Sequence, residues 1–306
     1  MVLPALIIAP RVLSGELEVG RIVQATGAFS AILSALTILV DNLEGLSRFA
    51  ASVGRLETFA RSLAPGAAPM PAKGNESRNT TIRTQEGRDI IFDNVTLKTP
   101  HGERTLVEGL TVSVPMGNGL LIVGGSGLGK SSLLRAIAGL WNTGEGTLVR
   151  PRSEEMLFLP QHAYMTSGSL RVQLNYPDLN RSVTDEVLRD VLVRVNLGGL
   201  VERCGGFDTD FDFEKMLSTG ERQRLAFARV LLRNPRYVLL DEATSALDGE
   251  NESALYEQLV ATSTTLISVS HRPALVKYHS QVLELKPEGA WSVHPSEKLG
   301  MVRDLA

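Results

Sequence analysis

The chain of 306 residues has almost no cysteine and almost no net charge, and both absences exclude classes of protein. Its single cysteine, Cys204, can form neither an intrachain disulfide nor a cysteine metal cluster, so zinc is excluded as a structural staple. The 31 Lys and Arg residues and the 34 Asp and Glu residues leave a net charge of -3, which gives no overall electrostatic reason to bind nucleic acid. We therefore expect no nucleic-acid partner.

The N-terminal region lacks the pattern of a signal peptide but contains a long uncharged run. Residues 1–10 are apolar, yet no Lys or Arg precedes them, a proline interrupts them and no small-residue cleavage site follows. We expect them to be the tail of a longer segment. From Ile22 to Val40 no residue is charged, and at helical rise this run is just long enough to cross a bilayer. A buried core helix is the alternative, but core helices ordinarily carry a charged face. The sequence therefore predicts a transmembrane helix over about 22–40, in contact with membrane lipid.

Polar residues recur at steps of three or four along this run and beyond it. They share one side of a helix that continues past the membrane: Thr26, Ser30, Ser34, Thr37, Asp41, Glu44 and Arg48. Close packing against other helices is favoured over a wall of a substrate pathway. Arg48, Arg55 and Arg61 follow the run, whereas Arg11 and Arg21 precede it. This slight bias predicts that the C-terminal side faces the cytosol or, in a plastid, the stroma.

The rest of the chain is predicted to be a linker and a soluble domain. Residues 65–87 are rich in Pro, Gly, Ser, Asn and Thr without a sustained apolar period, which indicates a linker between a membrane part, 1–64, and a domain over 88–306. The expected elements are strands at Ile90–Leu97, Thr105–Pro115 and Gly119–Gly124 and a helix at Lys130–Leu140. Strand and helix signals then alternate, so an α/β fold with an antiparallel β start is expected.

A glycine-rich loop carries the strongest chemical signal. It matches G-x-x-x-x-G-K-S after an apolar strand and before a helix, and its residues are Gly124, Gly125, Ser126, Gly127, Leu128, Gly129, Lys130, Ser131 and Ser132. Such glycines let backbone N–H groups converge on phosphate oxygens, the lysine reaches the terminal phosphates, and the serine hydroxyl ligates Mg²⁺. A turn with only a structural role does not require the Lys-Ser pair. The motif predicts an ATP site with Mg²⁺.

An acidic pair follows this loop by about a hundred residues. Asp241 and Glu242 end the apolar stretch YVLLDE. Asp241 is suited to hold magnesium, and Glu242 is suited to polarise the attacking water. Together with the loop, the pair predicts nucleotide hydrolysis.

The run LSTGERQR, from Leu217 to Arg224, resembles the signature motif of ATP-binding-cassette (ABC) proteins. Ser218 and Gly220 would present a hydroxyl and backbone N–H groups at a helix N-terminus to a γ-phosphate. The resemblance implies that this phosphate belongs to the ATP on a partner subunit. It also implies an ABC-type ATPase domain with an antiparallel β subdomain and a helical signature subdomain.

Three further residues occur in the order that the family has. Gln161 resembles the Q-loop residue, Asp248 the D-loop residue and His271 the switch histidine. The resemblance implies that Gln161 is a ligand of magnesium and senses the γ-phosphate, and that His271 donates to the γ-phosphate. It implies a place for Asp248 at the nucleotide.

The sequence departs from the family pattern at three positions. Thr219 and Glu221 stand where Gly and Gln are commoner, and Thr99 stands where an aromatic residue usually stacks on adenine. The last departure leaves purine selectivity in doubt.

Three runs carry a narrower resemblance within the family: Thr99-Pro-x-Gly102, Ala-Gly-Leu-Trp141 and Tyr176-Pro-Asp178. In these runs the chain resembles the subfamily D peroxisomal fatty-acid half-transporters and the related bacterial and plastid importers of peptides and cobalamin. Those proteins have six membrane helices, so the chain is expected to be the C-terminal part of such a transporter. A homodimer is favoured over a heterodimer because this one chain carries every motif. The transported substrate, a small molecule, lipid or peptide, stays open. A soluble ABC ATPase without transport and a non-catalytic ATP-binding fragment are the alternatives.

Overall fold

A computed structural model describes residues 2–16, 18, 20–63, 81–100 and 102–299. The chain divides into two compact units, Met1–Glu76 and Ser77–Ala306, which are described separately.

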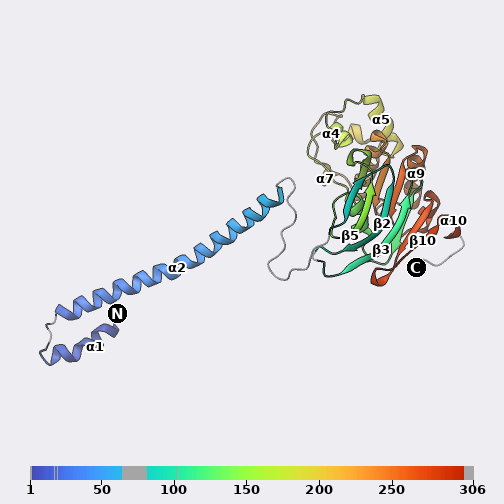
Figure 1. The fold of residues 1–306 in the computed structure, drawn as a ribbon. Coiled ribbons are helices and arrows are strands. Elements are labelled where there is room, and N and C mark those ends of the chain that lie inside the picture. Colours follow the sequence, from blue (N-terminus) through green and yellow to red (C-terminus); the bar gives the residue numbers. More distant parts are fainter. Residues whose placement is uncertain (1, 17, 19, 64–80, 101, 300–306) are drawn as a thin grey trace. The chain divides into compact units, whose positions relative to one another are not determined.

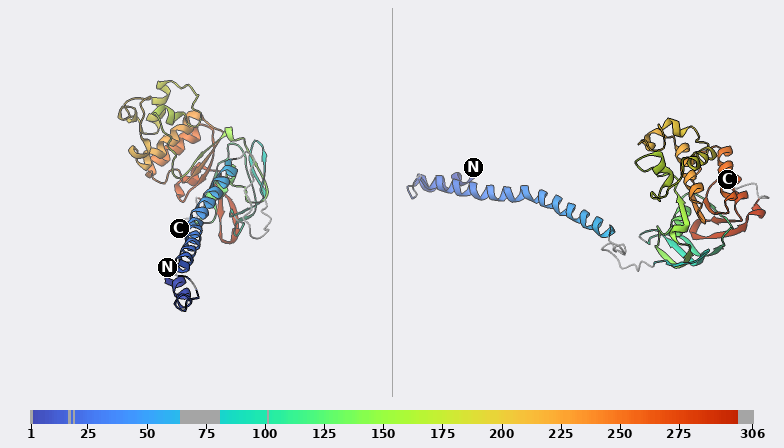
Figure 2. Two further views of the ribbon diagram at one scale, coloured as in Figure 1. Left: turned by 90° about the vertical axis from the view of Figure 1, so that its left-hand side faces the viewer. Right: turned by 90° about the horizontal axis from the view of Figure 1, so that it is seen from above.

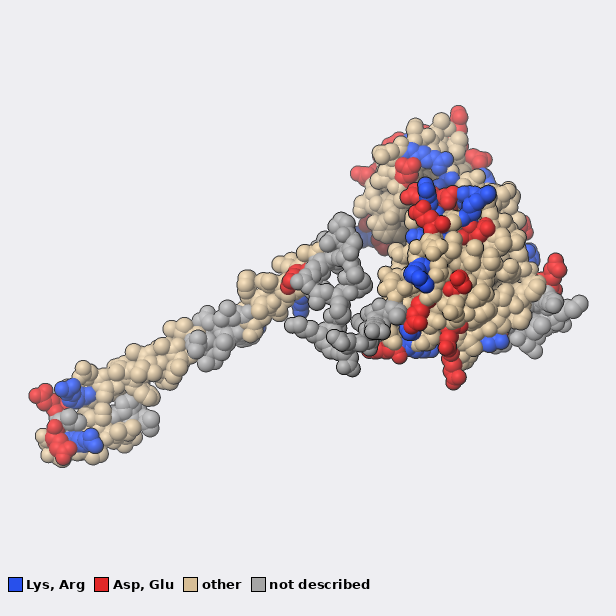
Figure 3. Space-filling model, viewed as in Figure 1, with Lys and Arg blue, Asp and Glu red and all other residues tan. Residues whose placement is uncertain are grey.

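In the residues that the structure describes, the first unit contains two helices. Helix α1, Val2–Leu13, packs against α2, a helix of 44 residues over Gly20–Leu63, and Figures 1 and 2 show α1 folded back beside the N-terminal part of α2. Within α2, Gly20–Ile38 is apolar and long enough to cross a membrane, close to the span predicted for 22–40. Its described side chains are largely exposed and uncharged (Figure 3).

Some of the polar side chains along α2 form hydrogen bonds with the backbone of the same helix. The hydroxyl of Thr26 donates to the carbonyl of Ile22 at 2.7 Å, and that of Thr37 donates to the carbonyl of Leu33 at 3.0 Å. Neither hydroxyl therefore needs a partner outside the helix to be tolerated in an apolar environment. The side chains of Asp41 and Glu44 lie outside the described residues.

The second unit begins with a four-stranded sheet in the order β1-β5-β2-β3. Its strands are β1 Arg83–Glu86, β2 Ile90–Lys98, β3 Thr105–Val114 and β5 Gly144–Arg150. The pair β2·β3 is antiparallel, as predicted, and the pair β2·β5 is antiparallel as well. Strand β1 differs from the prediction, which placed 65–87 in a linker. Its four residues are exposed and lack an apolar pattern, and parallel pairing with β5 makes them a strand.

A six-stranded sheet in the order β10-β9-β4-β8-β7-β6 forms the centre of this unit. Its strands are β4 Leu120–Gly124, β6 Met156–Leu159, β7 Tyr237–Asp241, β8 Thr265–Val269, β9 Gln281–Leu285 and β10 Trp291–Pro295. All its pairs are parallel except β9·β10. The carboxyl ends of β4, β8 and β7 therefore meet at one edge, where ligands bind in sheets of this kind.

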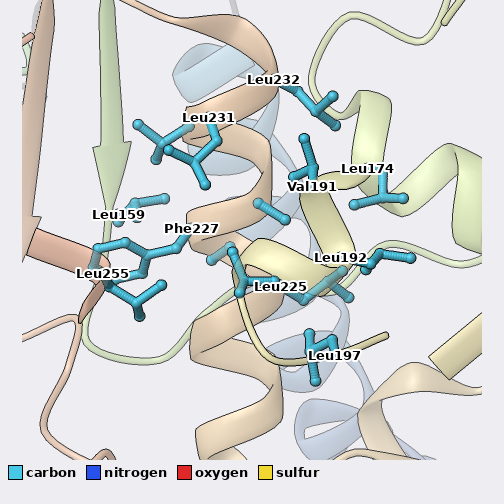
Figure 4. Packing of buried hydrophobic residues seen from close by; sticks show 14 of the residues in the cluster. Leu159, Leu174, Val191, Leu192, Leu197, Leu225, Phe227, Leu231, Leu232 and Leu255 are labelled. Atoms are coloured by element: carbon cyan, nitrogen blue, oxygen red, sulfur yellow. The ribbon is translucent and has the colours of Figure 1, made fainter. Parts of the chain in front are cut away.

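Helices complete the unit. They are α3 Lys130–Ile137, α4 Leu170–Asn175, α5 Asp185–Arg194, α6 Leu200–Arg203, α7 Phe213–Met216, α8 Thr219–Arg233, α9 Gly249–Ala261 and α10 Ser296–Leu299, with 3-10 turns η1 Ser153–Glu155, η2 Pro273–Tyr278 and η3 Pro287–Gly289. Figure 1 shows α4, α5 and α7 gathered at one end of the unit. Leucines and Phe227 from α4, α5, α8 and α9 fill the core there (Figure 4). The predicted α/β fold with an antiparallel part and a helical part is confirmed.

Candidate functional site

The glycine-rich loop leaves β4 at Gly124 and enters α3 at Lys130. Gly124 has φ +139°, and a Cβ there would lie 2.5 Å from the carbonyl oxygen of Leu285. Gly129 has φ +97°, and a Cβ there would lie 2.9 Å from Cβ of Leu106. Both positions therefore require glycine for the backbone to take this path.

Lys130 lies inside the loop that precedes it. Its ammonium donates to the carbonyls of Gly124 and Gly125 at 2.8 and 2.9 Å, and the residue is buried. Burial lowers the pKa of Lys130, while the nearby carboxylates of Glu242 and Asp241 act in the opposite direction. A cation held in this way lies where anionic phosphates would meet it together with the N-terminus of α3.

Ser131 and Asp241 form the contact between the two predicted phosphate-site motifs. The hydroxyl of Ser131 donates to Oδ1 of Asp241 at 2.7 Å, and Asp241 is buried at the end of β7. A hydroxyl and a carboxylate are the oxygen ligands that Mg²⁺ takes, with water and phosphate oxygens completing its shell. Within the described ranges no cluster of three or more His, Cys, Asp or Glu side chains is able to hold a metal. The donor set thus fits a magnesium ion bound together with a phosphate.

Glu242, itself predicted to be catalytic, contacts the other two predicted catalytic residues. The amide Nε2 of Gln161 donates to Oε2 of Glu242 at 3.0 Å, and Nε2 of His271 lies 3.3 Å from Oε1. Glu242 has φ +49°, an uncommon conformation for a residue with a side chain, and its backbone N–H donates to the carbonyl of Val269. The tertiary structure thus brings Gln161, Glu242 and His271 together from three segments. In this structure the side chain of Gln161 contacts Glu242. The role of Gln161 as a magnesium ligand stays a prediction.

The signature residues begin helix α8. The hydroxyl of Ser218 accepts from the N–H of Glu221 at 3.2 Å, and the N–H of Ser218 donates to Oε2 of Glu221 at 2.8 Å, which is a capping box. Glu221 also forms an ion pair with Arg203 at 2.8 Å. A glutamine, which is commoner in the family at this position, would lack the charge that pairs with Arg203. The departure from the family pattern at Glu221 therefore has a local structural reason. No hydrogen bond in the described part of the chain joins Ser218 or Gly220 to Lys130.

Asp248 has a structural role of its own. Its carboxylate accepts from the N–H of Asn251 and from the Asn251 side-chain amide, both at 2.8 Å, and so caps α9. Hydrogen bonds from Asn251 lower the pKa of Asp248. These contacts explain an aspartate at this position, and its predicted contact with nucleotide stays a prediction.

Thr99, at the position where the family usually has an adenine-stacking ring, lies in a turn. The hydroxyl of Thr99 accepts from the N–H of Arg104 at 3.2 Å, and this contact helps to close the connection between β2 and β3. Beside it, the indole of Trp141 donates to the carbonyl of Lys98 at 3.0 Å.

Three polar residues near the site were not predicted to matter. Gln223 and Glu252 are buried, with 1% and 2% exposed, and Arg272 pairs with Glu252 at 3.1 Å. Gln223 lies within the signature run and Arg272 next to His271, but a single sequence holds no signal that they contact the loop between β7 and α9. Their partners come from other segments.

A glycine-rich loop between a buried parallel strand and a helix, with an acidic residue from a nearby strand against its serine, defines a P-loop nucleotide-binding domain. A family model described as ABC transporter matches residues 107–245. The chain therefore contains a nucleotide-binding domain of the ABC transporter family, as its signature motif predicted.

Curated relatives cover nearly the whole chain. An uncharacterized ABC transporter ATP-binding protein of Synechocystis is 46% identical over 294 residues, which are 96% of this chain and 44% of that protein. The chloroplastic ABC transporter D family member 2 of Arabidopsis thaliana is 34% identical over 346 residues, covering 93% of this chain and 49% of the relative. The predicted kinship with subfamily D is confirmed, and the chain spans about half the length of these relatives.

The fold also matches a solved structure. The structure of a bacterial Atm1-family ABC exporter with ATP bound superposes with a TM-score of 0.64 at 23% identity, over 93% of this chain and 51% of that chain. The predicted ABC-type fold with an apolar helix before it is thereby confirmed.

Proposed function

We propose that the chain is the ATP-binding and ATP-hydrolysing part of an ABC-type membrane transporter. The observation that carries the proposal is the position of Glu242, which directly follows Asp241 at the phosphate site and is held by Gln161 and His271. A carboxylate placed in this way is suited to accept a proton from a water that attacks a γ-phosphate.

Each side chain then has a distinct task. Lys130 and the backbone N–H groups of the glycine-rich loop bind the phosphates, and Ser131 and Asp241 hold magnesium. When bound, magnesium neutralises charge on the phosphates. Glu242 orients the water and takes its proton, while the second Glu242 partner, His271, is exposed enough to reach a phosphate.

Hydrolysis by the full chain in detergent tests this proposal. We expect Glu242→Gln to keep ATP binding and to lower kcat by about 100-fold or more, because the base is lost while the phosphate contacts of Lys130 remain. Glu250→Gln, at an exposed acidic position in the first turn of α9, is the matched control and should leave kcat unchanged. Near-normal turnover of Glu242→Gln would show that Glu242 is not the base.

A second part of the proposal is a dimer with shared ATP sites. It is supported by Ser218, which begins α8 without a hydrogen bond to the P-loop of its own chain among the described residues. Each ATP would then lie between Lys130 of one subunit and Ser218 of the other. A homodimer is the simplest form, since the chain carries both halves of the site.

Mixed dimers test the shared site. A Lys130→Ala chain and a Ser218→Arg chain, each also carrying Glu242→Gln, should fail to trap ATP alone. When they are mixed, both defects fall in one site of a hybrid dimer, so a fraction of the dimers should trap ATP. If the mixture traps no more than either variant, while the Glu242→Gln chain traps ATP well, the shared-site dimer is wrong.

The membrane role rests on α2. Its segment Gly20–Ile38 would span the bilayer in contact with lipid, with the nucleotide-binding domain on the cytosolic or stromal side, and hydrolysis would drive movement of a small molecule, lipid or peptide. Extraction of the expressed chain tests this role. Retention in alkali-washed membranes until detergent is added supports a transporter subunit, and release without detergent favours a soluble ABC ATPase or a non-catalytic fragment.

A further inference from the structure

The loop between β7 and α9 is connected by hydrogen bonds to the two segments that carry Gln161 and His271, whose side chains contact Glu242. One tie is Gln223 of α8, whose amide donates to the carbonyl of Gln161 at 3.3 Å and to the hydroxyl of Ser245 at 3.2 Å. The side-chain oxygen of Gln223 accepts from the N–H of Ala246 at 3.0 Å. Gln223 therefore uses both ends of its amide, and it fixes the backbone of Gln161 against this loop.

The other tie is Arg272, the residue after His271. One guanidinium nitrogen of Arg272 donates to the loop carbonyls of Leu247 at 2.9 Å and Ser245 at 3.3 Å. Another pairs with the buried carboxylate of Glu252 at 3.1 Å. The second oxygen of Glu252 accepts from Thr244 at 2.6 Å, so the ion pair is held at both ends.

These contacts lead from one loop to one carboxylate by two routes. Gln161 contacts one oxygen of Glu242, and His271 contacts the other. Because Gln223 holds the backbone of Gln161, and Arg272 holds the segment of His271, a shift of the loop would shift both partners of Glu242. Gln223 and Glu252 are buried, so the part of the network that they form has little free space in which to absorb a displacement.

We propose that Gln223 and Arg272 are positioning residues for hydrolysis, which keep Gln161 and His271 aligned on Glu242 through the loop Ser245–Leu247. The inference rests on the proposed ATPase function. Among the described residues, neither Gln223 nor Arg272 forms a hydrogen bond with Lys130 or Ser131, so the inference concerns the hydrolytic step and not the binding of ATP.

Substitutions that keep part of each contact test the inference in the full chain. Gln223→Glu keeps the acceptor for Ala246 but removes the amide donor to Gln161. Arg272→Lys keeps the charge beside Glu252, but the donors of an ammonium all diverge from one nitrogen and do not reproduce the fixed fork that spans the carboxylate and both loop carbonyls. We expect each to lower kcat by about 10- to 100-fold, since small displacements of catalytic groups have effects of that size. The dissociation constant for ATP should change by less than about twofold, as expected when only the transition state loses stabilisation.

A control pair lies on the same two segments. Glu257 of α9 forms an ion pair with Lys277 at 3.9 Å, but both side chains are exposed. Glu257→Gln should leave kcat unchanged, whereas Glu252→Gln, the same change in the buried pair, should lower it. Thermal unfolding of each variant, followed in parallel, shows what fraction is folded at the assay temperature.

The effect in a Glu242→Gln background distinguishes positioning from general damage. If Gln223 and Arg272 act through Glu242, adding Gln223→Glu or Arg272→Lys to Glu242→Gln should not slow the residual single-turnover hydrolysis further. An unchanged kcat in both single variants would overturn the inference, and so would a rate loss of the same factor in both backgrounds. If the wild-type chain hydrolyses ATP no faster than Glu242→Gln, the proposed function fails instead, and the inference falls with it.

Discussion

Acidification should destabilise the nucleotide-binding domain through one buried histidine. His279 is 4% exposed, and burial lowers its pKa to about 4 from the ordinary value of 6.5. Its Nδ1 lies 2.8 Å from the carbonyl of Leu275, which only accepts, so Nδ1 carries the proton. Its Nε2 lies 2.8 Å from the hydroxyl of Ser268 and therefore accepts from it, and Ser268 in turn accepts from Tyr256 at 3.2 Å. A second proton on the ring, at Nε2, would remove the acceptor for the Ser268 hydroxyl.

The sign and size follow from the two pKa values. As the pH falls below 6.5, the unfolded chain binds a proton at His279 while the folded chain does not until the pH nears 4, so the free energy of unfolding decreases through this window. The loss amounts to about 2 kcal/mol at pH 5 and about 3 kcal/mol at pH 4. Well above pH 6.5 the histidine is neutral in both states and contributes no pH dependence.

Urea unfolding at pH 8 and pH 5 measures this effect. The two tryptophans of the chain, Trp141 and Trp291, both pack against the core of this domain, so their fluorescence reports on its unfolding. His279→Gln offers a donor and an acceptor that do not titrate. We expect the wild type to lose about 2 kcal/mol more than His279→Gln between the two pH values, as the proton linkage requires. Equal losses in the two proteins would refute the reasoning.

Three further predictions concern single residues. Thr99→Tyr should tighten ATP by about 1 kcal/mol and reduce competition by GTP, because it supplies a stacking ring; unchanged competition binding would argue against that position. Gly129→Ala should lower the free energy of unfolding by about 1–3 kcal/mol and weaken ATP binding, since the new Cβ meets Leu106 at a positive φ; normal values in urea unfolding and nucleotide titration would contradict this. Arg229→Met should cost about 3 kcal/mol in urea unfolding, because the backbone carbonyls of Gln173 and Tyr164 lose the donors that Arg229 supplies; an unshifted midpoint would contradict it.

The parts of this protein that are local in the chain were predictable from the sequence. The P-loop is one contiguous motif whose glycines and lysine have only one common use, and β2 and β4 follow from apolar patterns within a few residues. The signature run identified the family and thereby the order of Gln161, Asp248 and His271. Strand β1 was missed because its exposed residues have no pattern of their own, and only the neighbouring β5 makes them a strand.

The tertiary structure alone decided which of these residues meet. Gln161 and Glu242 are 81 positions apart, and their contact exists because β6 and β7 are neighbours in the parallel sheet. The ties through Gln223 and Arg272 span 62 and 25 positions, and the single sequence shows no periodicity that links them. Periodicity and propensity report on the faces of one helix or strand. Which buried polar groups satisfy one another depends on how elements pack, and here that packing set the partners of the carboxylate that we propose as the base.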